Sequence, residues 1–223
     1  MSMAFSFDRT PTSSRFRVLT VCTGNICRSP MAEQYLRAGF DRAGLSDVLV
    51  ESAGTMAQDG QGMPAQAEAL VRRFGADPSD HRARYLFEGH VAGADLVFGM
   101  AREHRRAVVS LFPRASRVSF TLREFARLAA GMTDVDLADA AALPLDDVAG
   151  RLRSAVSAVA ARRGLVEPAA DPIDDDVIDP YRLADSVFDE SGRQLVPAAD
   201  TVLNLLTAAA KITKTGGGAL DGS

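Results

Sequence analysis

The sequence predicts an α/β protein in which a parallel sheet is covered by helices on both faces. Three observations lead to this fold class. Short apolar runs rich in β-branched residues alternate with stretches in which apolar residues recur at helical spacing. Such alternation is typical of parallel strands joined by helical crossovers. With 223 residues, the chain is also long enough for one well-buried domain with an insertion.

The regular alternation occupies the first part of the chain. The expected strands are 16–22, 48–52, 94–99 and 117–120. The expected helices are 30–44, 65–75, 101–111 and 122–130. Because open parallel sheets bind ligands at the carboxyl ends of their strands, the loop that follows the first strand is the expected ligand site.

Residues 131–170 depart from this pattern. The segment begins with several aspartates and continues, from 145 to 163, with apolar residues at helical spacing. We expect an extra helix packed on the domain surface, the alternative being a partner-binding element or a flap beside the ligand site. A last helix is expected from about Leu183, or at least from Pro197, to Lys211.

One domain is expected over residues 16–212. Residues 1–15 are polar and lack the cationic start and apolar core of a signal peptide, which predicts a disordered leader. Residues 213–223 include three consecutive glycines after Thr215 and predict a flexible tail.

Charge, hydropathy and cysteine content narrow the function classes. The formal net charge of −4 and the pI near 5.4 argue against nucleic acid or an anionic membrane as the main partner. No apolar stretch is long enough to span a membrane. The only cysteines, Cys22 and Cys27, share one loop, so no disulfide framework is expected and a cytoplasmic location fits.

The loop after the first strand has the composition of an oxyanion site. Its sequence is Cys22-Thr23-Gly24-Asn25-Ile26-Cys27-Arg28-Ser29-Pro30. Ser29 is expected at the N-cap of the following helix and Pro30 at its first position, where the missing N–H is tolerated. The backbone amides between strand and helix are then free to bind an anion near the helix N-terminus.

The side chains of this loop point to nucleophilic chemistry on a phosphate-like group. Amides, a helix N-terminus and an arginine all stabilise a thiolate, and Cys22 lies where all three act. Arg28 carries a planar fork that matches two oxygens of a tetrahedral anion. Gly24 and Asn25 are the residue types that best tolerate the positive φ of a tight loop. Ser29 can also donate a hydrogen bond to the Cys22 sulfur. A buried structural cysteine is the alternative.

With its flanking residues, this loop resembles the active-site loop of the low-molecular-weight protein tyrosine phosphatases, in their bacterial form. The resemblance covers about 170 residues and leaves 131–170 and the two tails outside. Further matching segments are Ser52-Ala53-Gly54-Thr55, Gly62-Met63-Pro64, His81-Arg82-Ala83-Arg84, Asp95 to Met100 with His104, and Asp179-Pro180-Tyr181-Arg182. It implies a doubly wound sheet of four strands, with residues 22–29 as the phosphate-binding loop.

The resemblance also implies roles for residues outside the loop. Asp179 would be the general acid and base, and Tyr181 would line the cleft wall. Asp171 and Asp176 are competitors for the acid role, whereas Asp174 and Asp175 are interpreted as solvated loop residues.

Two supporting residues and one redox role follow from the same resemblance. Ser52 and His81 would hold Asn25 and keep the loop amides in place. Cys27 is either a small residue filling loop space or a redox partner of Cys22. His90 and His104 are interpreted as surface or capping residues. Three widely separated histidines predict no metal site.

The sequence therefore predicts a phosphomonoester hydrolase that forms a phosphocysteine on Cys22, and the resemblance implies that it is a protein tyrosine phosphatase. No cofactor is expected, because Arg28 and the loop amides supply the positive field. The expected substrate is a phosphotyrosine protein or another phosphomonoester, and the expected state is a monomer or weak dimer. One alternative is an arsenate reductase that takes electrons from a small thiol. The other is a non-catalytic phosphoprotein-binding module.

Overall fold

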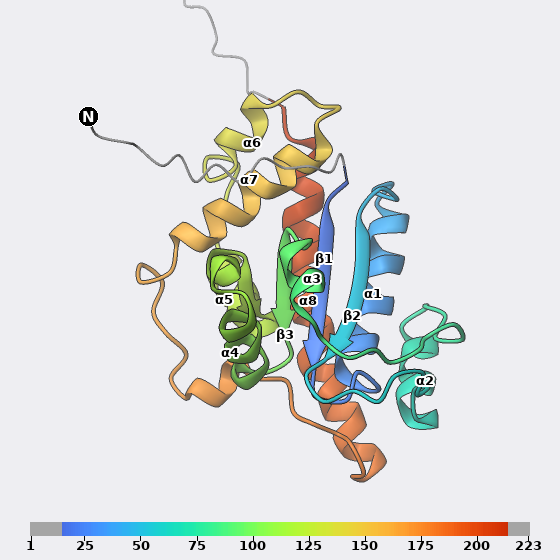
Figure 1. Ribbon diagram of the computed structural model, residues 1–223. Coiled ribbons are helices and arrows are strands. Elements are labelled where there is room, and N and C mark those ends of the chain that lie inside the picture. The colour runs from blue at the N-terminus through green and yellow to red at the C-terminus, as the bar shows by residue number, and fades with distance from the viewer. Residues whose placement is uncertain (1–14, 214–223) are drawn as a thin grey trace, which may run out of the picture.

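A parallel four-stranded sheet forms the centre of the molecule (Figure 1). The structure is a computed structural model and describes residues 15–213. The strands lie in the order β2-β1-β3-β4, with bounds β1 Arg17–Cys22, β2 Leu49–Gly54, β3 Leu96–Gly99 and β4 Ser119–Thr121. All three neighbouring pairs are parallel. The predicted α/β fold class is confirmed.

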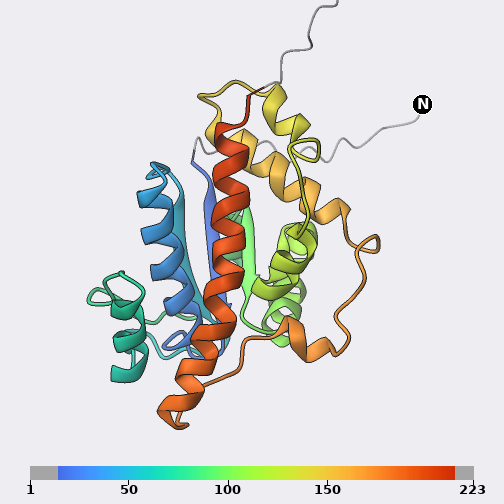
Figure 2. The ribbon, with the colours of Figure 1, turned by 180° about the vertical axis from the view of Figure 1, so that it is seen from behind.

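Helices cover both faces of this sheet. The helices of the first part of the chain are α1 Arg28–Arg42, α2 Ala65–Arg73, α3 Glu88–Ala92, α4 Arg102–Leu111 and α5 Leu122–Ala129. Seen from behind, the long C-terminal helix α8, Asp185–Lys211, crosses the sheet between α1 and α5 (Figure 2). Helices α3 and α4 lie on the opposite face, toward the viewer of Figure 1.

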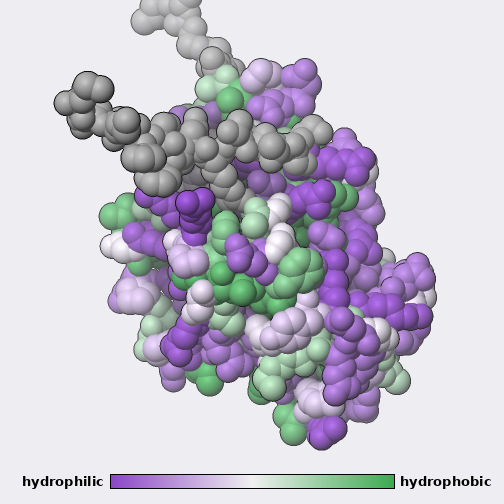
Figure 3. Space-filling model, viewed as in Figure 1, coloured by the Kyte–Doolittle hydropathy of each residue, from purple (hydrophilic) through white to green (hydrophobic). Residues whose placement is uncertain are grey.

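Two apolar cores correspond to these two faces. The larger one lies under α1, α5 and α8 and includes Met31, Leu36, Phe98 and Phe125, all fully buried. The smaller one is built around Val97 and lies under α3 and α4. On the outside of the α3–α4 face, apolar residues gather near α3 and are surrounded by hydrophilic ones (Figure 3).

The segment 131–170 carries two helices, α6 Ala138–Ala142 and α7 Val148–Ala161. Helix α7 packs on α8 and α5, so the segment is a packed part of the domain, as the helical pattern predicts. Its Arg151 is buried, at 1% exposure, and donates hydrogen bonds to the carbonyls of Leu143, Ala209 and Ile212. The buried guanidinium thereby satisfies carbonyls at the C-terminal end of α8.

An arginine just after α7 reaches the outer edge of the sheet. Strand β4 lies at this edge. The carbonyl of Val118, the residue before β4, accepts a hydrogen bond from the Val97 N–H of β3. The next carbonyl, that of Ser119, accepts hydrogen bonds from Arg163 and Arg105. The Arg163 guanidinium also lies 3.9 Å from the Phe120 ring centroid. The edge strand is therefore covered by arginine side chains.

Some boundaries differ from the predicted ones. Helix α1 begins at Arg28 rather than at Pro30, and Pro30 is still within the first turn, where no N–H partner is needed. Helix α8 begins at Asp185 and continues through Pro197. The expected leader falls on residues 1–14 and the expected tail on 214–223, apart from Arg15 and Thr213, and these ranges lie outside the described residues.

A separate pair of short 3₁₀ turns completes the secondary structure, at Pro113–Arg117 and Pro172–Asp175. None of the helices within residues 15–213 is both long and apolar enough to cross a bilayer.

Candidate active site

A pocket of about 390 Å³ opens at the carboxyl end of β1. Most of the predicted phosphate loop, Cys22–Ser29, forms its floor. Its lining residues are Cys22, Thr23, Gly24, Ile26, Cys27, Arg28, Met56, Gln58, Gln61, Asp179, Tyr181 and Arg182. The structure thus brings Asp179 and Tyr181, from a distant part of the chain, to the loop that contains Cys22.

The Cys22 sulfur lies at the base of the pocket and accepts two hydrogen bonds. The backbone N–H of Asn25 donates to Sγ over 3.3 Å, and the Ser29 hydroxyl donates over 3.0 Å. The side chain is 3% exposed. Donors aimed at a sulfur stabilise its thiolate form. Ser29 therefore uses its hydroxyl on the sulfur and does not cap α1, whose N-cap is Cys27.

Asn25 holds the shape of the loop. Its φ is +53°, in the left-handed region that non-glycine residues seldom adopt. The Nδ2 group donates to the hydroxyls of Ser29 (3.0 Å) and Ser52 (2.8 Å), and Oδ1 accepts from the backbone N–H of Arg84 (2.9 Å). Gly24 does not share the positive φ, so this part of the loop prediction is wrong for Gly24.

A second contact to Asn25 comes from His81, which donates from Nε2 to the Asn25 carbonyl over 2.7 Å. Burial lowers the pKa of His81, while the Asn25 carbonyl and the Glu33 carboxylate act in the opposite direction. The two residues expected to support the loop therefore both contact Asn25. Ser52 does so from β2, and His81 from the segment between α2 and α3.

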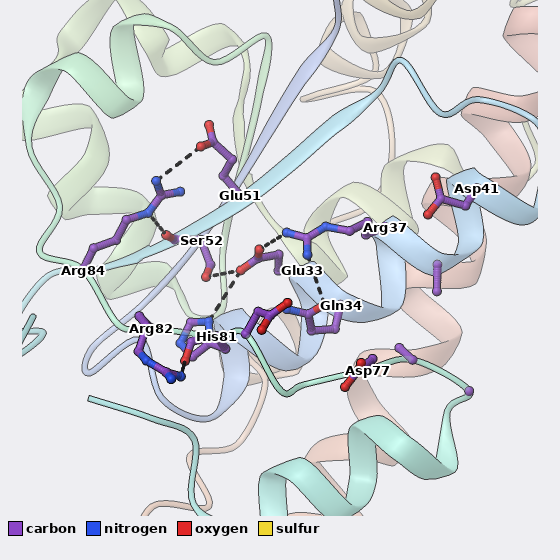
Figure 4. A pocket seen from close by; sticks show the side chains of 14 residues that line it. Glu33, Gln34, Arg37, Asp41, Glu51, Ser52, Asp77, His81, Arg82 and Arg84 are labelled. Atoms are coloured by element: carbon purple, nitrogen blue, oxygen red, sulfur yellow. Dashed lines mark hydrogen bonds and ion pairs between the residues drawn. The ribbon is translucent and has the colours of Figure 1, made fainter. Parts of the chain in front are cut away.

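The carboxylate of Glu33 connects these two supporting residues. It accepts hydrogen bonds from Ser52 Oγ and Arg37 Nη2, and its Oε2 lies 3.8 Å from His81 Nδ1 (Figure 4). A carboxylate only accepts hydrogen bonds. Ser52 must therefore donate to Glu33 and accept from Asn25. The Ser29 hydroxyl also accepts from Asn25, and its oxygen lies 3.0 Å from the Cys22 sulfur and 3.4 Å from the Ala53 carbonyl oxygen. The network borders a groove of about 530 Å³ behind the loop.

Close backbone packing also supports the loop. Gly54 ends β2 directly beside it, and a Cβ at this position would lie 2.6 Å from the Thr23 carbonyl oxygen and 2.8 Å from the Asn25 nitrogen. Such contacts are too short for any side chain, so this position requires glycine.

Arg28 and Asp179 face each other across the pocket. Arg28 Nη2 lies 2.6 Å from Asp179 Oδ2, and Nη1 donates to the carbonyl of Val177 over 3.2 Å. The Arg28 side chain is 5% exposed, whereas that of Asp179 is 48% exposed. The carboxylate is thus open to solvent and substrate on one side and paired with the arginine on the other.

The chain that leads to Asp179 is fastened by arginines. Asp175 pairs with Arg127 over 2.7 Å, and Asp176 pairs with Arg102 over 3.1 Å. The interpretation of Asp175 as a solvated loop residue is wrong, because its side chain is only 15% exposed in this pair. Asp171 accepts from the Ile173 N–H. Neither Asp171 nor Asp176 lines the pocket, so among these candidates Asp179 alone does.

The family model for low molecular weight phosphotyrosine protein phosphatases matches residues 17–158. The chain belongs to this family. It is therefore a hydrolase of the low molecular weight protein phosphatase type. The matched residues include the phosphate loop, Ser52, His81 and His104, whereas Asp179 lies beyond them.

Two relatives of this phosphatase carry different substrate names. A protein-arginine-phosphatase of Geobacillus stearothermophilus is 35% identical over 131 residues, which make up 59% of this chain and 82% of the relative. A low molecular weight protein-tyrosine-phosphatase of Streptomyces coelicolor is 39% identical over 129 residues, 56% of this chain and 77% of the relative.

Solved structures confirm the phosphatase fold. The low molecular weight protein tyrosine phosphatase of T. tengcongensis superposes with a TM-score of 0.59 at 30% identity, covering 85% of this chain and 98% of the other. The fold of the family, a four-stranded parallel sheet with helices, is thus shown for this chain.

One phosphatase residue was missed by the sequence interpretation. His104 is 1% exposed, and its Nε2 lies 3.0 Å from Thr23 Oγ1 in the phosphate loop. Burial, with a contribution from Arg28, lowers the pKa of His104 to about 4, whereas Asp176 acts in the opposite direction. The available signal was its spacing: His104 precedes the buried Val108 by one helical turn on α4.

Two other side chains complete the comparison with the predicted roles. His90 is partly exposed and stacks on Phe87 at 3.8 Å between ring centroids, as expected for a surface residue. Cys27 is buried in the phosphate loop, and burial raises the pKa of its thiol to about 12. It is therefore a neutral thiol on the same loop as Cys22.

Proposed function

We propose that this phosphatase removes phosphate from phosphotyrosine in proteins through a phosphocysteine on Cys22. The observation that carries the proposal is the pair of hydrogen bonds that Asn25 N–H and Ser29 Oγ donate to Cys22 Sγ. This sulfur lies in a pocket that Arg28 and Asp179 also line. A stabilised sulfur, an arginine fork and a carboxyl group are the three groups that phosphoryl transfer through cysteine needs.

In the first step the thiolate of Cys22 attacks phosphorus in line with the leaving oxygen. The S–P bond forms while the P–O bond to the tyrosine breaks. Arg28 and the loop amides hold the three equatorial oxygens, which carry the charge of the transition state. Substrate phosphate therefore replaces Asp179 as the partner of the Arg28 guanidinium.

Asp179 then serves the leaving group and the water. Its carboxyl proton goes to the departing phenolate oxygen, so that neutral tyrosine leaves. The resulting carboxylate takes a proton from water as the water oxygen attacks phosphorus. The S–P bond breaks, inorganic phosphate leaves, and the Cys22 thiolate and the protonated Asp179 are regenerated.

Phosphotyrosine suits the pocket walls better than phosphoarginine. Ile26, Met56 and Tyr181 offer apolar surface to an aromatic ring. A phosphorylated guanidinium instead needs acceptors for its N–H groups. Among the lining residues Asp179 is the single carboxylate, and Arg182 adds a positive charge that repels a guanidinium.

Phosphoarginine is the second candidate, because a relative 35% identical to this chain is a protein-arginine-phosphatase. The same loop chemistry would then act on a P–N bond, and Asp179 would protonate nitrogen. Arsenate reduction by a small thiol and binding without catalysis are weaker alternatives, since neither needs Asp179 in the pocket.

The test gives the purified protein a phosphotyrosine peptide, a phosphoarginine protein and, separately, arsenate with glutathione. We expect the phosphotyrosine peptide to have the highest kcat/KM, and Cys22→Ser to lower kcat on the order of 10⁵-fold or more. After a rapid acid quench, ³²P from labelled substrate should remain on the wild-type protein and be absent from Cys22→Ser.

Three outcomes contradict the proposal. Undiminished hydrolysis by Cys22→Ser excludes the phosphocysteine. A higher kcat/KM for the phosphoarginine protein transfers the function to the second candidate. Arsenate turnover without phosphatase activity establishes the reductase.

A further inference from the structure

Arg182 has a free charge at the mouth of the active-site pocket. Three lining residues are charged, and two of them, Arg28 and Asp179, pair with each other. Within residues 15–213, the Arg182 guanidinium makes one close contact, with its Cζ 5.0 Å from the centroid of the Tyr181 ring, and no hydrogen bond or ion pair. Its charge is therefore available to a ligand.

The backbone at Arg182 favours a different residue type. The Leu183 N–H donates to the Pro180 carbonyl over 3.0 Å and closes a turn in which Arg182 is the third residue. Its φ is +61°. Glycine or asparagine is the usual residue at a turn position with positive φ. An arginine here is strained, and strain of this kind is concentrated at functional sites.

Stacking presents the guanidinium beside the slot. Tyr181 lines the pocket and is 42% exposed, so one face of its ring is available to the arginine. A guanidinium over an aromatic face is held by cation–π attraction. Its N–H groups lie in the guanidinium plane and remain free to donate hydrogen bonds. The charge is therefore held beside Tyr181, where both residues line the pocket.

Arg182 determines the sign of the electrostatic potential at the pocket mouth. Met56, Gln58 and Gln61 also line the pocket and carry no charge. One unpaired positive charge next to uncharged residues makes the local potential positive, which attracts negative groups and repels positive ones.

We infer that Arg182 is a specificity-determining residue that selects phosphotyrosines flanked by aspartate or glutamate. This inference rests on the proposed phosphotyrosine phosphatase activity. With the phosphate on the Cys22 loop and the ring in the slot, the peptide backbone of the substrate lies at the pocket mouth. A neighbouring residue is about 3.8 Å further along that backbone, so its carboxylate comes within reach of the Arg182 fork.

The expected preference is modest, because the ion pair forms at an exposed rim. Exposed pairs of this kind change affinity by about two- to fivefold. A flanking lysine or arginine in the substrate should be disfavoured by a similar factor.

The experiment measures kcat/KM for three phosphotyrosine peptides that differ in their two flanking residues, which are glutamate, alanine or lysine. Each is compared in wild type, Arg182→Gln, Arg182→Glu and Arg182→Lys. Arg106→Gln is the matched control, since Arg106 is an exposed arginine of α4 outside the pocket lining and gives the same change in net charge.

At low salt we expect the wild-type kcat/KM to be about two- to fivefold higher for the glutamate peptide than for the alanine peptide. At 1 M salt the two values should be about equal. Arg182→Gln should bring the ratio to one, Arg182→Glu should favour the lysine peptide, and Arg182→Lys should keep the glutamate preference. Arg106→Gln should leave the ratio at its wild-type value.

Failure of the inference and failure of the proposed function look different. Equal hydrolysis of all peptides by wild type, or a glutamate preference that survives in Arg182→Glu, overturns the role of Arg182 alone. No hydrolysis of any phosphotyrosine peptide by a folded wild-type protein overturns the proposed function and this inference with it. Thermal unfolding of each variant shows whether it is folded.

Discussion

The phosphate loop and the loop that carries Asp179 are held in opposite ways. Asn25, Ser29 and Cys22 are almost completely buried, and each has partners inside the protein. Asp179 is about half exposed, and its side chain is fixed by the Arg28 pair and a turn contact to the Tyr181 N–H. We infer from this difference that the phosphate-loop half of the site is preorganised for an oxyanion, whereas the Asp179 half can exchange partners during turnover.

The largest effect is expected from the exchangeable half. Asp179→Asn should lower kcat about 10²–10⁴-fold on phosphotyrosine peptides, because an amide cannot protonate the phenolate. The loss should shrink on aryl phosphates with nitro-substituted leaving groups, and the melting temperature should stay within a few degrees. Asp189→Asn is the matched control, since Asp189 forms an exposed ion pair with Arg73 outside the pocket. A uniform loss over all leaving groups would remove Asp179 from the acid role.

The preorganised half should respond to pH through its stability. The His104 pKa is lowered from 6.5 to about 4, so on acidification the unfolded chain takes up the proton first. Stability is therefore present above about pH 6.5 and is lost as the pH falls toward 4, by at most about 3 kcal/mol.

Urea unfolding of wild type and His104→Asn at pH 7 and pH 4.5 checks this prediction. Carboxylates titrate in both proteins, so the difference between the two is the relevant quantity. We expect the variant to lose less stability on acidification than wild type. Equal losses in the two proteins would show that His104 is already protonated or solvated.

The Glu33 carboxylate offers a finer test of preorganisation. Glu33→Gln should lower the free energy of unfolding by about 1–3 kcal/mol and kcat by about tenfold, because the glutamine amide has one acceptor oxygen in place of the two that accept from Ser52 Oγ and Arg37 Nη2. The control is Glu68→Gln on α2, which breaks the Arg72–Glu68 pair of the same i,i+4 spacing on the surface. That change should cost about 0.3–0.5 kcal/mol and leave kcat unaffected. Similar effects from both variants would mean that the buried network does not support the loop.

The smallest effect on resting activity is expected at Cys27. Burial raises its pKa to about 12, so it does not compete with Cys22 as a nucleophile, and Cys27→Ala should keep kcat within about twofold. We propose that hydrogen peroxide oxidises Cys22 to a sulfenic acid and is reduced to water. The Cys27 sulfur then attacks the Cys22 sulfur while its thiol proton goes to the departing hydroxide, so that water leaves and a disulfide forms. Dithiothreitol should then restore wild-type activity and fail to restore that of peroxide-treated Cys27→Ala. Equal recovery would leave Cys27 as a space-filling residue.

Much of the fold and part of the site could be predicted from the sequence. The alternation of apolar and helical patterns was enough for the parallel sheet, because strand burial and helical spacing are local properties of the chain. The composition of residues 22–29 was enough to predict an oxyanion loop. Asn25 has the positive φ that its residue type tolerates.

The remaining errors share one physical origin. Ser29 was predicted both to cap a helix and to donate to the Cys22 sulfur, and only the cap is wrong, because the N-cap of α1 is Cys27. Asp175 was predicted to be solvated, but it meets Arg127, 48 residues away. The contact of His104 with Thr23 spans 81 residues. Local patterns contain propensities and periodicities, whereas these pairings exist only after the sheet has brought distant segments together.

The arginines over the outer strand bear on how copies of the chain behave in a crowded solution. An uncovered edge strand offers free acceptors on which a strand of another molecule can add, and this is a common route to aggregation. In this protein the outward carbonyl of Ser119 is already occupied by Arg163 and Arg105. Arg163, from the segment 131–170, thus covers one outward acceptor of the edge strand, and we expect that shortening this segment would lower the concentration at which the protein remains dispersed.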